Sequence, residues 1–556
     1  MMPCCSMVRT VAVLGAGPSG LTSIKSCLDE GLEPTCFESG PDIGGLWRFK
    51  NKPEPGRANI YQSVVINTSK EMMAFSDFPP PAHFPNNMHH SEVLLYLRQY
   101  AQTFGLLQHI HLQTTVVGVR QTPDFASSGR WEVETERHDG QRESHVFDAV
   151  MVCTGHYATP NLPLKDFPGI DSFEGKYFHS WEYRSPEGLE GKRVVVVGMG
   201  NSGGDIAVDI SRVAEKVYLS TRSGAWVLGR VGPGGLPQDL FGTSRLDLLK
   251  LKLFPSWVNR MTEKKINQFF DHQLYGIRPT HDFLSQVPVV NDDLPARIIT
   301  GRVQVKPNLK RFEGSDAIFD DGTVVKKVDV VVFATGYNYG FPFLPSDLQF
   351  KCGPGPQHRV YRHVFALGLA PPTLALIGLI DGNGPVNRLA ELQARWATRI
   401  FKGLISLPSQ EVMAKYIEKE MATVCKRFTN AEKNPLQVDI PTYIDSLVKD
   451  VGVQPNLLRL FLTDPKLAWQ VLLGPSTPYQ FRLCGPGNWE GARGAILNLW
   501  ERVHQPFRSR RPEPAPQTKR PQGLIVLLSG AAILMFYFYK NHHLRLSFFS
   551  FNNVRS

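Results

Sequence analysis

The chain of 556 residues is predicted to have an α/β fold with two parallel-sheet units, followed by one C-terminal transmembrane helix. Three observations predict it: two glycine-rich turns, each between an apolar strand and a helix, and a long apolar run near the C-terminus. At about 150 residues per domain, the length suggests three or four domains. Because 42% of the residues are hydrophobic and 20% are charged, the chain can bury large cores, which excludes a disordered or fibrous protein.

The first glycine-rich turn is Gly15-Ala16-Gly17-Pro18-Ser19-Gly20, between a strand at 11–14 and a helix predicted over 21–30. It has the Rossmann pattern: the first glycine allows a tight turn, the second lets a pyrophosphate approach the backbone, and the third packs helix against strand. N–H groups at the helix N-terminus would hold the phosphates. A second strand at 35–38 ends in Glu38, whose carboxylate would accept hydrogen bonds from ribose hydroxyls. This unit is therefore predicted to bind a dinucleotide without a 2′-phosphate, of the FAD type.

The second glycine-rich turn is Gly198-Met199-Gly200-Asn201-Ser202-Gly203, between a strand at 193–197 and a helix predicted over 204–213, which begins with Gly204. The next strand, 216–221, ends in Thr221-Arg222 instead of an acidic residue. A carboxylate there would repel a 2′-phosphate, whereas a hydroxyl and a guanidinium bind one. This second Rossmann unit is predicted to bind a dinucleotide of the NADP type. Taken alone, Arg222 could also be an ordinary surface arginine.

Two further apolar strands, at 149–155 and 330–336, both run into a Thr-Gly turn. Strands of this type often connect two dinucleotide domains, so the NADPH unit is predicted to be inserted into a discontinuous FAD unit. The segment 223–300, with candidate helices at 246–254 and 263–272, either covers the active site or pads the nucleotide unit. The predicted boundaries are 8–160 and 329–445 for the FAD unit, 161–328 for the NADPH unit, 446–507 for a C-terminal helical region, 508–522 for a basic linker and 523–539 for the anchor.

The C-terminal tail carries most of the excess charge. The whole chain has a net charge of +10, and residues 508–556 hold eight basic residues and one acidic residue, so the body carries only +3. This distribution argues against a nucleic-acid interface. The apolar run at 523–539 has 17 residues without a charge, about 25 Å as a helix, close to the minimum for crossing a bilayer. A buried core helix is the alternative. The basic linker before the run, and Tyr537 and Tyr539 at its end, favour a membrane anchor with the body in the cytosol.

Eight cysteines are spread over the chain without C-x-x-C spacing, which argues against a disulfide framework or a zinc site and favours a reducing compartment. Adjacent histidines cannot readily converge on one metal ion, so His89-His90 and His542-His543 are interpreted as surface residues. No secretory signal is recognised in the first nine residues.

Several longer sequence motifs lie between and after the two glycine turns. The segment 173–183, with Phe173, Gly175, His179 and Tyr183, matches the F-x-G-x-x-x-H-x-x-x-Y/F fingerprint of the flavin-containing monooxygenases, just before the second glycine turn. Matching segments are also found at 44–47, 67–72, 333–337, 391–396 and 485–491, so the resemblance covers 9–505 and the apolar tail. Segments 263–267, 291–295 and 451–458 are most similar to the fifth vertebrate isoform group, which is associated with Baeyer–Villiger oxidation.

The resemblance implies an NADPH- and O2-dependent monooxygenase. In such enzymes NADPH reduces FAD, oxygen adds to the flavin to give a C4a-hydroperoxyflavin, and the retained NADP+ shields this adduct from water. The implied reactions are N- and S-oxygenation of amines and sulfides or Baeyer–Villiger oxidation of ketones to esters, with some leakage to H2O2. The implied partners are small lipophilic substrates and membrane lipid. The resemblance also implies the endoplasmic reticulum membrane, with the body on the cytosolic side, and allows a homo-oligomer.

The resemblance also assigns the site residues, and it assigns no metal ligand. Asn67 matches the family asparagine near both flavin and nicotinamide, where an amide can donate and accept without charge. FAD contacts are implied for Gly15, Ala16, Gly17, Pro18, Ser19, Gly20, Glu38, Leu46, Trp47, Asn67 and Thr68. NADP contacts are implied for Ile66, Asn67, Gly198, Gly200, Asn201, Ser202, Gly203, Gly204, Thr221 and Arg222.

Other interpretations of these residues stay open. Asn67 also begins an N-x-S sequon, which would suit a glycosylated surface loop, but a cytosolic body argues against it. His179 and Tyr183 could be an acid and a base, although a linker that couples two domains is the preferred interpretation. Bacterial Baeyer–Villiger enzymes have Trp at the fingerprint position of Tyr183. The alternative functions are an FAD- and NADPH-dependent disulfide reductase, for which Cys27 and Cys36 are the nearest dithiol candidates, and a membrane-bound redox sensor without turnover.

Overall fold

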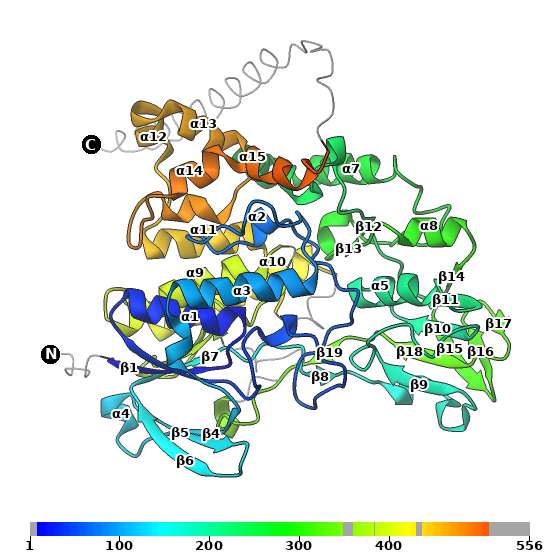
Figure 1. The fold of residues 1–556 in the computed structure, drawn as a ribbon, viewed down its shortest axis with the longest axis horizontal. Helices are drawn as coiled ribbons and strands as arrows, with labels where there is room; N and C mark the ends of the chain where they lie inside the picture. Colours follow the sequence, from blue (N-terminus) through cyan, green and yellow to red (C-terminus); the bar gives the residue numbers. More distant parts are fainter. Residues whose placement is uncertain (1–7, 349–359, 383, 430–435, 511–556) are drawn as a thin grey trace, which may run out of the picture. The chain divides into compact units, whose positions relative to one another are not determined.

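The computed structural model describes residues 8–348, 360–382, 384–429 and 436–510. Residues up to Pro506 fold as one unit that contains two large, mainly parallel sheets. The first sheet lies beneath α1 and α3 in Figure 1, and the second lies around β10 and β11. The predicted α/β fold is confirmed.

The first sheet has the strand order β20-β21-β22-β7-β1-β2-β3. Its strands are β1 (Thr10–Leu14), β2 (Glu33–Phe37), β3 (Ile110–His111), β7 (Ala149–Val152), β20 (Val360–Tyr361), β21 (Phe365–Ala366) and β22 (Leu374–Leu376). The central strand β1 is parallel to β2 and β7, and β22 is parallel to β7. The chain thus leaves this sheet after β7 and returns to it more than 200 residues later, at β20.

The second sheet has the order β14-β11-β10-β18-β9, with every pair parallel. Its strands are β9 (Lys176–His179), β10 (Arg193–Val197), β11 (Lys216–Ser220), β14 (Val303–Lys306) and β18 (Val330–Phe333). The predicted boundaries assign residues 330–333, which form β18, to the second part of the FAD unit, because that part was predicted to begin at residue 329. This placement is wrong, because β18 hydrogen-bonds to β10 and β9. The second unit therefore extends at least to Phe333.

Each large sheet lies between helices and a smaller antiparallel sheet. In β1, Val11 and Val13 pack against α1 (Pro18–Asp29), α3 (His90–Thr103) and α9 (Val386–Phe401), whereas Ala12 and Leu14 pack against β5 (Trp131–Arg137). In β10, Val194 and Val196 pack against α5 (Asn201–Ile210). This alternation follows from the period of two along a strand, and it explains why both strands are uninterrupted apolar runs.

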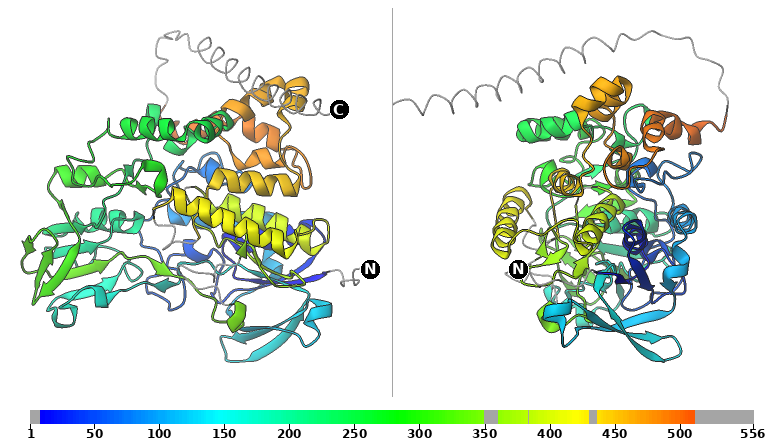
Figure 2. Two further views of the ribbon diagram at one scale, coloured as in Figure 1. Left: turned by 180° about the vertical axis from the view of Figure 1, so that it is seen from behind. Right: turned by 90° about the vertical axis from the view of Figure 1, so that its left-hand side faces the viewer.

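The smaller sheets are formed by β4 (Thr114–Gln121), β5 and β6 (Arg142–Phe147), and by β15 (Leu309–Glu313), β16 (Asp316–Phe319) and β17 (Val324–Val325). Two-stranded pairs are β8 (Thr159–Pro160) with β19 (Tyr337–Asn338), and β12 (Val227–Leu228) with β13 (Val289–Val290). The remaining helices are α2 (Lys70–Met73), α4 (Phe125–Ser128), α6 (Arg245–Leu253), α7 (Pro255–Ile266), α8 (Leu294–Ile299), α10 (Gln410–Arg427), α11 (Ile440–Val451), α12 (Leu457–Thr463), α13 (Pro465–Leu473), α14 (Ala492–Leu497) and α15 (Leu499–His504). Figure 2 shows α9, α10 and α11 from behind, on the opposite side of the first sheet from β4, β5 and β6.

The insertion at 223–300 contains the predicted helix at 246–254, shifted by one residue as α6. The helix predicted at 263–272 is wrong in its second half, because α7 begins at Pro255 and ends at Ile266. Proline fits the first turn of a helix, where its missing N–H is not needed, so it sets the start eight residues earlier. Beyond α7, His272 is buried, and its Nε2 accepts a hydrogen bond from the Val227 N–H at 3.0 Å.

Among the described residues, no helix has both the length and the apolar character needed to cross a membrane. The anchor predicted at 523–539 lies outside the described residues, as does most of the basic linker at 508–522.

Candidate functional site

The first glycine turn leaves no room for a side chain at Gly15 or Gly20. Gly15 has φ of +99°, and a Cβ atom on it would lie 3.1 Å from the carbonyl oxygen of Cys153. A Cβ on Gly20 would lie only 1.8 Å from the carbonyl oxygen of Gly15. Pro18 begins α1, so the N–H groups of its first turn surround the bend after Gly17. The backbone therefore forms the close-approach surface that a pyrophosphate needs, and the residues present fit an adenine dinucleotide.

Glu38 lies directly beside this turn. Its Oε2 accepts a hydrogen bond from the Ala16 N–H at 2.8 Å, and its Oε1 accepts one from the Gly40 N–H at 2.6 Å. Two backbone donors therefore orient the carboxylate at the end of β2, and each oxygen keeps a further lone pair. This is the placement needed to accept hydrogen bonds from ribose hydroxyls.

The segment at 44–47 contacts the same turn from a separate loop. The Gly44 N–H donates to the Ala16 carbonyl at 3.0 Å, and a Cβ on Gly45 would lie only 3.0 Å from the Cα of Gly17. Leu46 and Trp47 continue this loop as a single 3-10 turn (Gly45–Trp47), and Trp47 packs against the large core next to α1. The structure thus brings together the glycine turn, Glu38, Leu46 and Trp47, and their contacts with FAD stay a prediction.

Asn67 lies where the first unit meets the insertion of the second. Its half-buried side chain accepts, through Oδ1, a hydrogen bond from Arg230 Nη2 at 2.8 Å. The same guanidinium donates to the carbonyls of Ile66 at 3.2 Å and Val65 at 3.3 Å. Asn87 Nδ2 donates to the carbonyls of Ile66 and Thr68 at 3.3 and 3.1 Å. A side chain held this way by another segment does not suit an exposed glycosylation loop.

Arg230 was missed by the sequence analysis, because no motif marks it. It is held by Asp292, whose Oδ1 accepts from the Arg230 N–H at 2.8 Å and whose Oδ2 pairs with Arg230 Nη1 at 3.4 Å. Its side chain is only 14% exposed, so the interaction with Asn67 is shielded from water. The only sequence signal was indirect: Asp292 belongs to the segment 291–295 that carries the subgroup resemblance.

The second glycine turn repeats the geometry of the first. A Cβ on Gly203 would lie 2.0 Å from the Gly198 carbonyl, whereas Gly200 has open space around its Cβ position. Asn201 Oδ1 accepts a hydrogen bond from the Val290 N–H at 2.8 Å, which ties α5 to β13. Ser202 is half-buried in the first turn of α5, and Gly204 packs against Val289, with its Cβ position 3.1 Å from Cγ1. The turn has room for a second pyrophosphate at Gly200.

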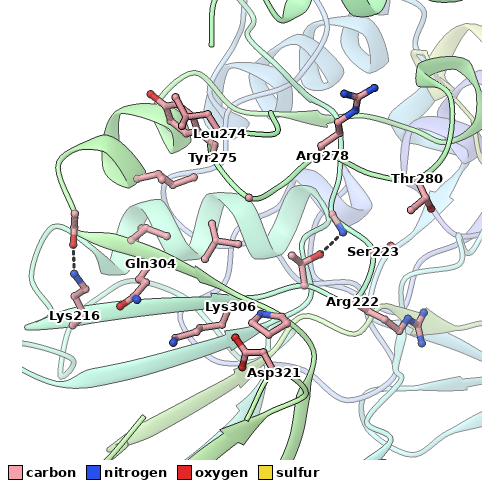
Figure 3. A pocket seen from close by; sticks show the side chains of 18 residues that line it. Lys216, Arg222, Ser223, Leu274, Tyr275, Arg278, Thr280, Gln304, Lys306 and Asp321 are labelled. Carbon is pink, nitrogen blue, oxygen red and sulfur yellow. Dashed lines mark hydrogen bonds between the residues drawn. The ribbon is translucent and has the colours of Figure 1, made fainter. Parts of the chain in front are cut away.

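A cavity of about 830 Å³ lies beside the ends of β11 and β14 (Figure 3). Thr221 lines it at the end of β11, and its Oγ1 accepts from the Gly224 N–H at 3.0 Å. Arg222, Arg278 and Lys306 line the cavity from three different segments, together with Lys216 and the single acidic residue Asp321. Four cationic side chains against one carboxylate favour an anionic ligand such as a 2′-phosphate. The assignment of Thr221 and Arg222 to NADP stays a prediction.

The fingerprint residues Tyr183 and His179 are each hydrogen-bonded to a partner other than one another. Tyr183 is buried, and its hydroxyl donates to Asp209 of α5 at 2.8 Å. Tyr61, from the first unit, donates to Asp205 of the same helix at 2.7 Å. His179 is buried at the end of β9, where its Nδ1 accepts from the Trp181 N–H at 3.0 Å and burial lowers its pKa. The Tyr61 contact, and a hydrogen bond from Trp181 Nε1 of the fingerprint to the Arg57 carbonyl of the first unit at 2.7 Å, join the two units here and support the linker interpretation.

The cysteines nearest the first glycine turn are poor redox candidates. Cys27, Cys36 and Cys153 are buried, and burial raises the pKa of Cys153 to about 12 and also raises the pKa of the other two thiols. Thiolates are the reactive form in disulfide exchange, so these thiols would react slowly at neutral pH. Among the described residues, no cluster of metal-ligating side chains is found.

Comparisons with known proteins define the class. The family model described as "FMO-like: Flavin-binding monooxygenase-like" matches residues 8–540. The chain therefore belongs to this family and is a flavin-dependent monooxygenase, which confirms the predicted resemblance, the enzyme class and the cofactors FAD and NADPH. Because the chain belongs to this family of monooxygenases, we set aside the alternative functions of a disulfide reductase and of a redox sensor without turnover.

The relatives place the chain within the family. Flavin-containing monooxygenase 5 of Rattus norvegicus and that of Homo sapiens are each 50% identical to it, over 95% of this chain and 99% of theirs. Dimethylaniline monooxygenase [N-oxide-forming] 2 of Macaca mulatta is 49% identical, over 91% of this chain and 94% of its own. Among solved structures, S-allyl-L-cysteine S-oxygenase from Allium sativum has a TM-score of 0.60 at 24% identity, covering 90% of this chain and 99% of its own. Closed cyclohexanone monooxygenase has a TM-score of 0.58 at 17% identity, covering 80% and 97%, and this likeness supports the fold.

Proposed function

We propose that this protein uses NADPH and O2 to oxygenate small lipophilic molecules, at the nitrogen or sulfur of amines and sulfides and at the carbonyl of ketones. The supporting observation is the contact between Asn67 and Arg230, which joins the FAD-type unit to the insertion of the NADP-type unit. The reduced flavin supplies the electrons that activate oxygen. The chain has to bind both nucleotides, orient them and exclude water, and no strong acid or nucleophile is required.

Different residues would carry out these tasks. The glycine turns at Gly15 and Gly198 would hold the two pyrophosphates, and Glu38 and Arg222 would discriminate between the two adenosines. With Oδ1 of Asn67 engaged by Arg230, the NH2 group of the same side chain would serve as a neutral donor to a bound nucleotide. A fixed neutral donor can stabilise developing negative charge without titrating itself.

Both substrate classes belong to the proposal. Relatives named Flavin-containing monooxygenase 5 and a relative named for N-oxide formation share about half of their residues with this chain. Tyr183 stands where bacterial ketone-oxidising enzymes have Trp, and its hydroxyl donates a hydrogen bond to Asp209 of α5.

The deciding experiment is product analysis of the FAD-loaded protein with one alkyl sulfide and one aliphatic ketone, with NADPH oxidation and H2O2 followed in parallel. We expect sulfoxide, ester or both, and H2O2 as the balance of the NADPH consumed. NADH serves as the control for the adenosine preference. FAD-loaded protein that oxidises NADPH to H2O2 alone with either substrate, and with a panel of amines, would contradict the proposal.

We further propose that residues 523–539 anchor the protein in the endoplasmic reticulum membrane, with the catalytic body in the cytosol. The support is the uncharged run of 17 residues after a basic linker. Ending the chain after Gln522 should move the protein from the membrane fraction to the supernatant with its FAD content unchanged. Membrane partitioning equal to that of the full chain would contradict a single C-terminal anchor. Homo-oligomerisation stays a prediction.

A further inference from the structure

The insertion contacts the Asn67 turn through one short segment, residues 230–239, which we name the strap. Its two ends are joined by an antiparallel bridge between Val231 and Pro237 and by a hydrogen bond from the Gln238 N–H to the Arg230 carbonyl at 2.8 Å. In between, the Gly232 N–H donates to the Leu236 carbonyl at 2.7 Å. The strap is therefore a closed hairpin with a fixed distance between its ends.

Each end of the strap holds a different part of the same turn. At one end, Arg230 donates to Asn67 Oδ1. At the other end, Asp239 Oδ2 accepts two hydrogen bonds from Ser69, from its backbone N–H at 2.7 Å and from its hydroxyl at 3.1 Å. Ser69 is fully buried and immediately precedes α2. The strap thus fixes both the side chain of Asn67 and the backbone two residues later.

Burying the carboxylate of Asp239 in this position costs folding free energy. Its Oδ1 is buried, and within the described part of the chain it has no hydrogen-bond partner. An apolar or amide side chain would avoid the desolvation of a charge, so stability alone does not favour a carboxylate there. The next residue, Leu240, is buried with Met72, Leu499 and Val503. The packing of the segment therefore does not depend on the charge of Asp239.

We propose that Asp239 is a positioning residue for Asn67: it fixes the Asn67–Ser69 turn from the insertion, so that the Asn67 amide keeps one orientation toward the bound nucleotides. This inference rests on the proposed function, because the orientation of Asn67 matters only if that side chain acts beside the flavin. The insertion, whose role the sequence left open, then contributes a positioning residue to the site.

The test compares Asp239→Ala, Asp239→Asn and Asp247→Ala in the FAD-loaded full chain. Asp239→Ala removes both acceptor contacts to Ser69, whereas Asp239→Asn keeps an oxygen that can accept them. Asp247 is the matched control, because this carboxylate of the same insertion bonds to Ser244 at the start of α6. The first measurement is hydrogen exchange of the peptide 65–73 without NADPH or substrate. We expect about tenfold faster exchange in Asp239→Ala and no change in Asp247→Ala.

The second measurement is the ratio of H2O2 to oxygenated product. In Asp239→Ala we expect this ratio to rise at least about threefold while FAD content and the KM for NADPH are unchanged, and we expect Asp239→Asn to restore it. Loss of folding or of FAD in Asp239→Ala would make Asp239 structural and overturn the proposal, and so would a ratio in Asp239→Asn as high as in Asp239→Ala. So would unchanged exchange at 65–73. Failure of the proposed function is seen separately, as absence of oxygenated product from the unsubstituted protein.

Discussion

Replacing Arg230 with alanine tests whether the Asn67 amide has to be held in place. The Arg230 guanidinium donates three hydrogen bonds to the segment 65–67. The shortest, at 2.8 Å, is to Asn67 Oδ1, and the two to the carbonyls of Val65 and Ile66 are longer than 3.1 Å. A hydrogen bond with one charged partner contributes about 1.5–3 kcal/mol. Only the bond to Asn67 bears on the reacting atoms, so the expected loss in the rate of oxygenated product is about 10- to 100-fold.

The effect on folding should be smaller than the effect on coupling. In Arg230→Ala, the backbone N–H groups of residue 230 and Val231 can still donate to Asp292 Oδ1, at 2.8 and 3.3 Å. The carboxylate therefore keeps two partners. Arg212→Ala is the matched control, since it removes an exposed pair with Asp293, the residue after Asp292, and exposed pairs contribute about 0–1 kcal/mol.

The assay measures NADPH oxidation, H2O2 and oxygenated product at saturating NADPH, with the FAD content fixed by its absorbance. Arg230→Ala should oxidise NADPH with most of the electrons appearing as H2O2, whereas Arg212→Ala should match the unsubstituted protein. Arg230→Lys keeps the charge but not the planar fork of donors, so it should give an intermediate ratio. Product formation and coupling in Arg230→Ala equal to those of the unsubstituted protein would refute this reasoning.

Three other substitutions test separate parts of the structure. Arg222→Ala should raise the KM for NADPH about tenfold or more and leave the KM for NADH unchanged, because only NADPH carries the 2′-phosphate; equal changes would contradict the assignment. Arg502→Ala leaves the fully buried Glu71 without its ion-pair partner, so denaturant unfolding should show a loss of about 3–5 kcal/mol, against about 1 kcal/mol or less for the exposed Arg493→Ala. Burial raises the pKa of Asp239 to about 6, so the folded state binds this proton more tightly than the unfolded state. The stability that follows is fully present below about pH 3.8 and is lost as pH rises through about 6; Asp239→Asn should therefore gain up to about 3 kcal/mol relative to the unsubstituted protein between pH 3.5 and 7.5, and parallel unfolding profiles would disprove this.

The parts of the site that depend on backbone geometry could be predicted from the sequence. A tight turn requires glycine for local steric reasons: Gly15 has φ of +99°, and a Cβ on Gly20 would collide with the Gly15 carbonyl oxygen. Both requirements can therefore be recognised from the sequence motif alone. The same is true of Glu38, since its position follows from the end of a strand that pairs with the strand before the turn. Local patterns of this kind identify where a nucleotide can approach a backbone.

The parts that depend on long-range pairing could not be predicted. Asn67 and Arg230 are 163 residues apart, and a lone arginine in an irregular insertion has no local pattern that marks it. The domain boundary at 328/329 was misplaced for a related reason. The strand at 330–333 is apolar in either sheet, and only its hydrogen bonds to β10 and β9 decide which sheet it joins. The start of α7, by contrast, had a local signal in Pro255 that the sequence analysis did not use.

The segment that follows Asn67 is held at further points by buried charges from the C-terminal half of the chain. Glu71 pairs with Arg502, and Ser76 donates its N–H to Glu391, which is itself paired with Arg482 at 2.8 Å. Burying such pairs costs several kcal/mol per ion, so apolar residues of similar volume would stabilise the fold as well or better. The ion pairs instead fix the conformation of the segment, because each pair can form in only one arrangement of it. The strap contacts the same segment at Asn67 and Ser69, so three separate parts of the chain contribute to setting its conformation. A site that works by orienting a neutral amide requires this kind of support, because nothing in the amide's own chemistry would select its orientation.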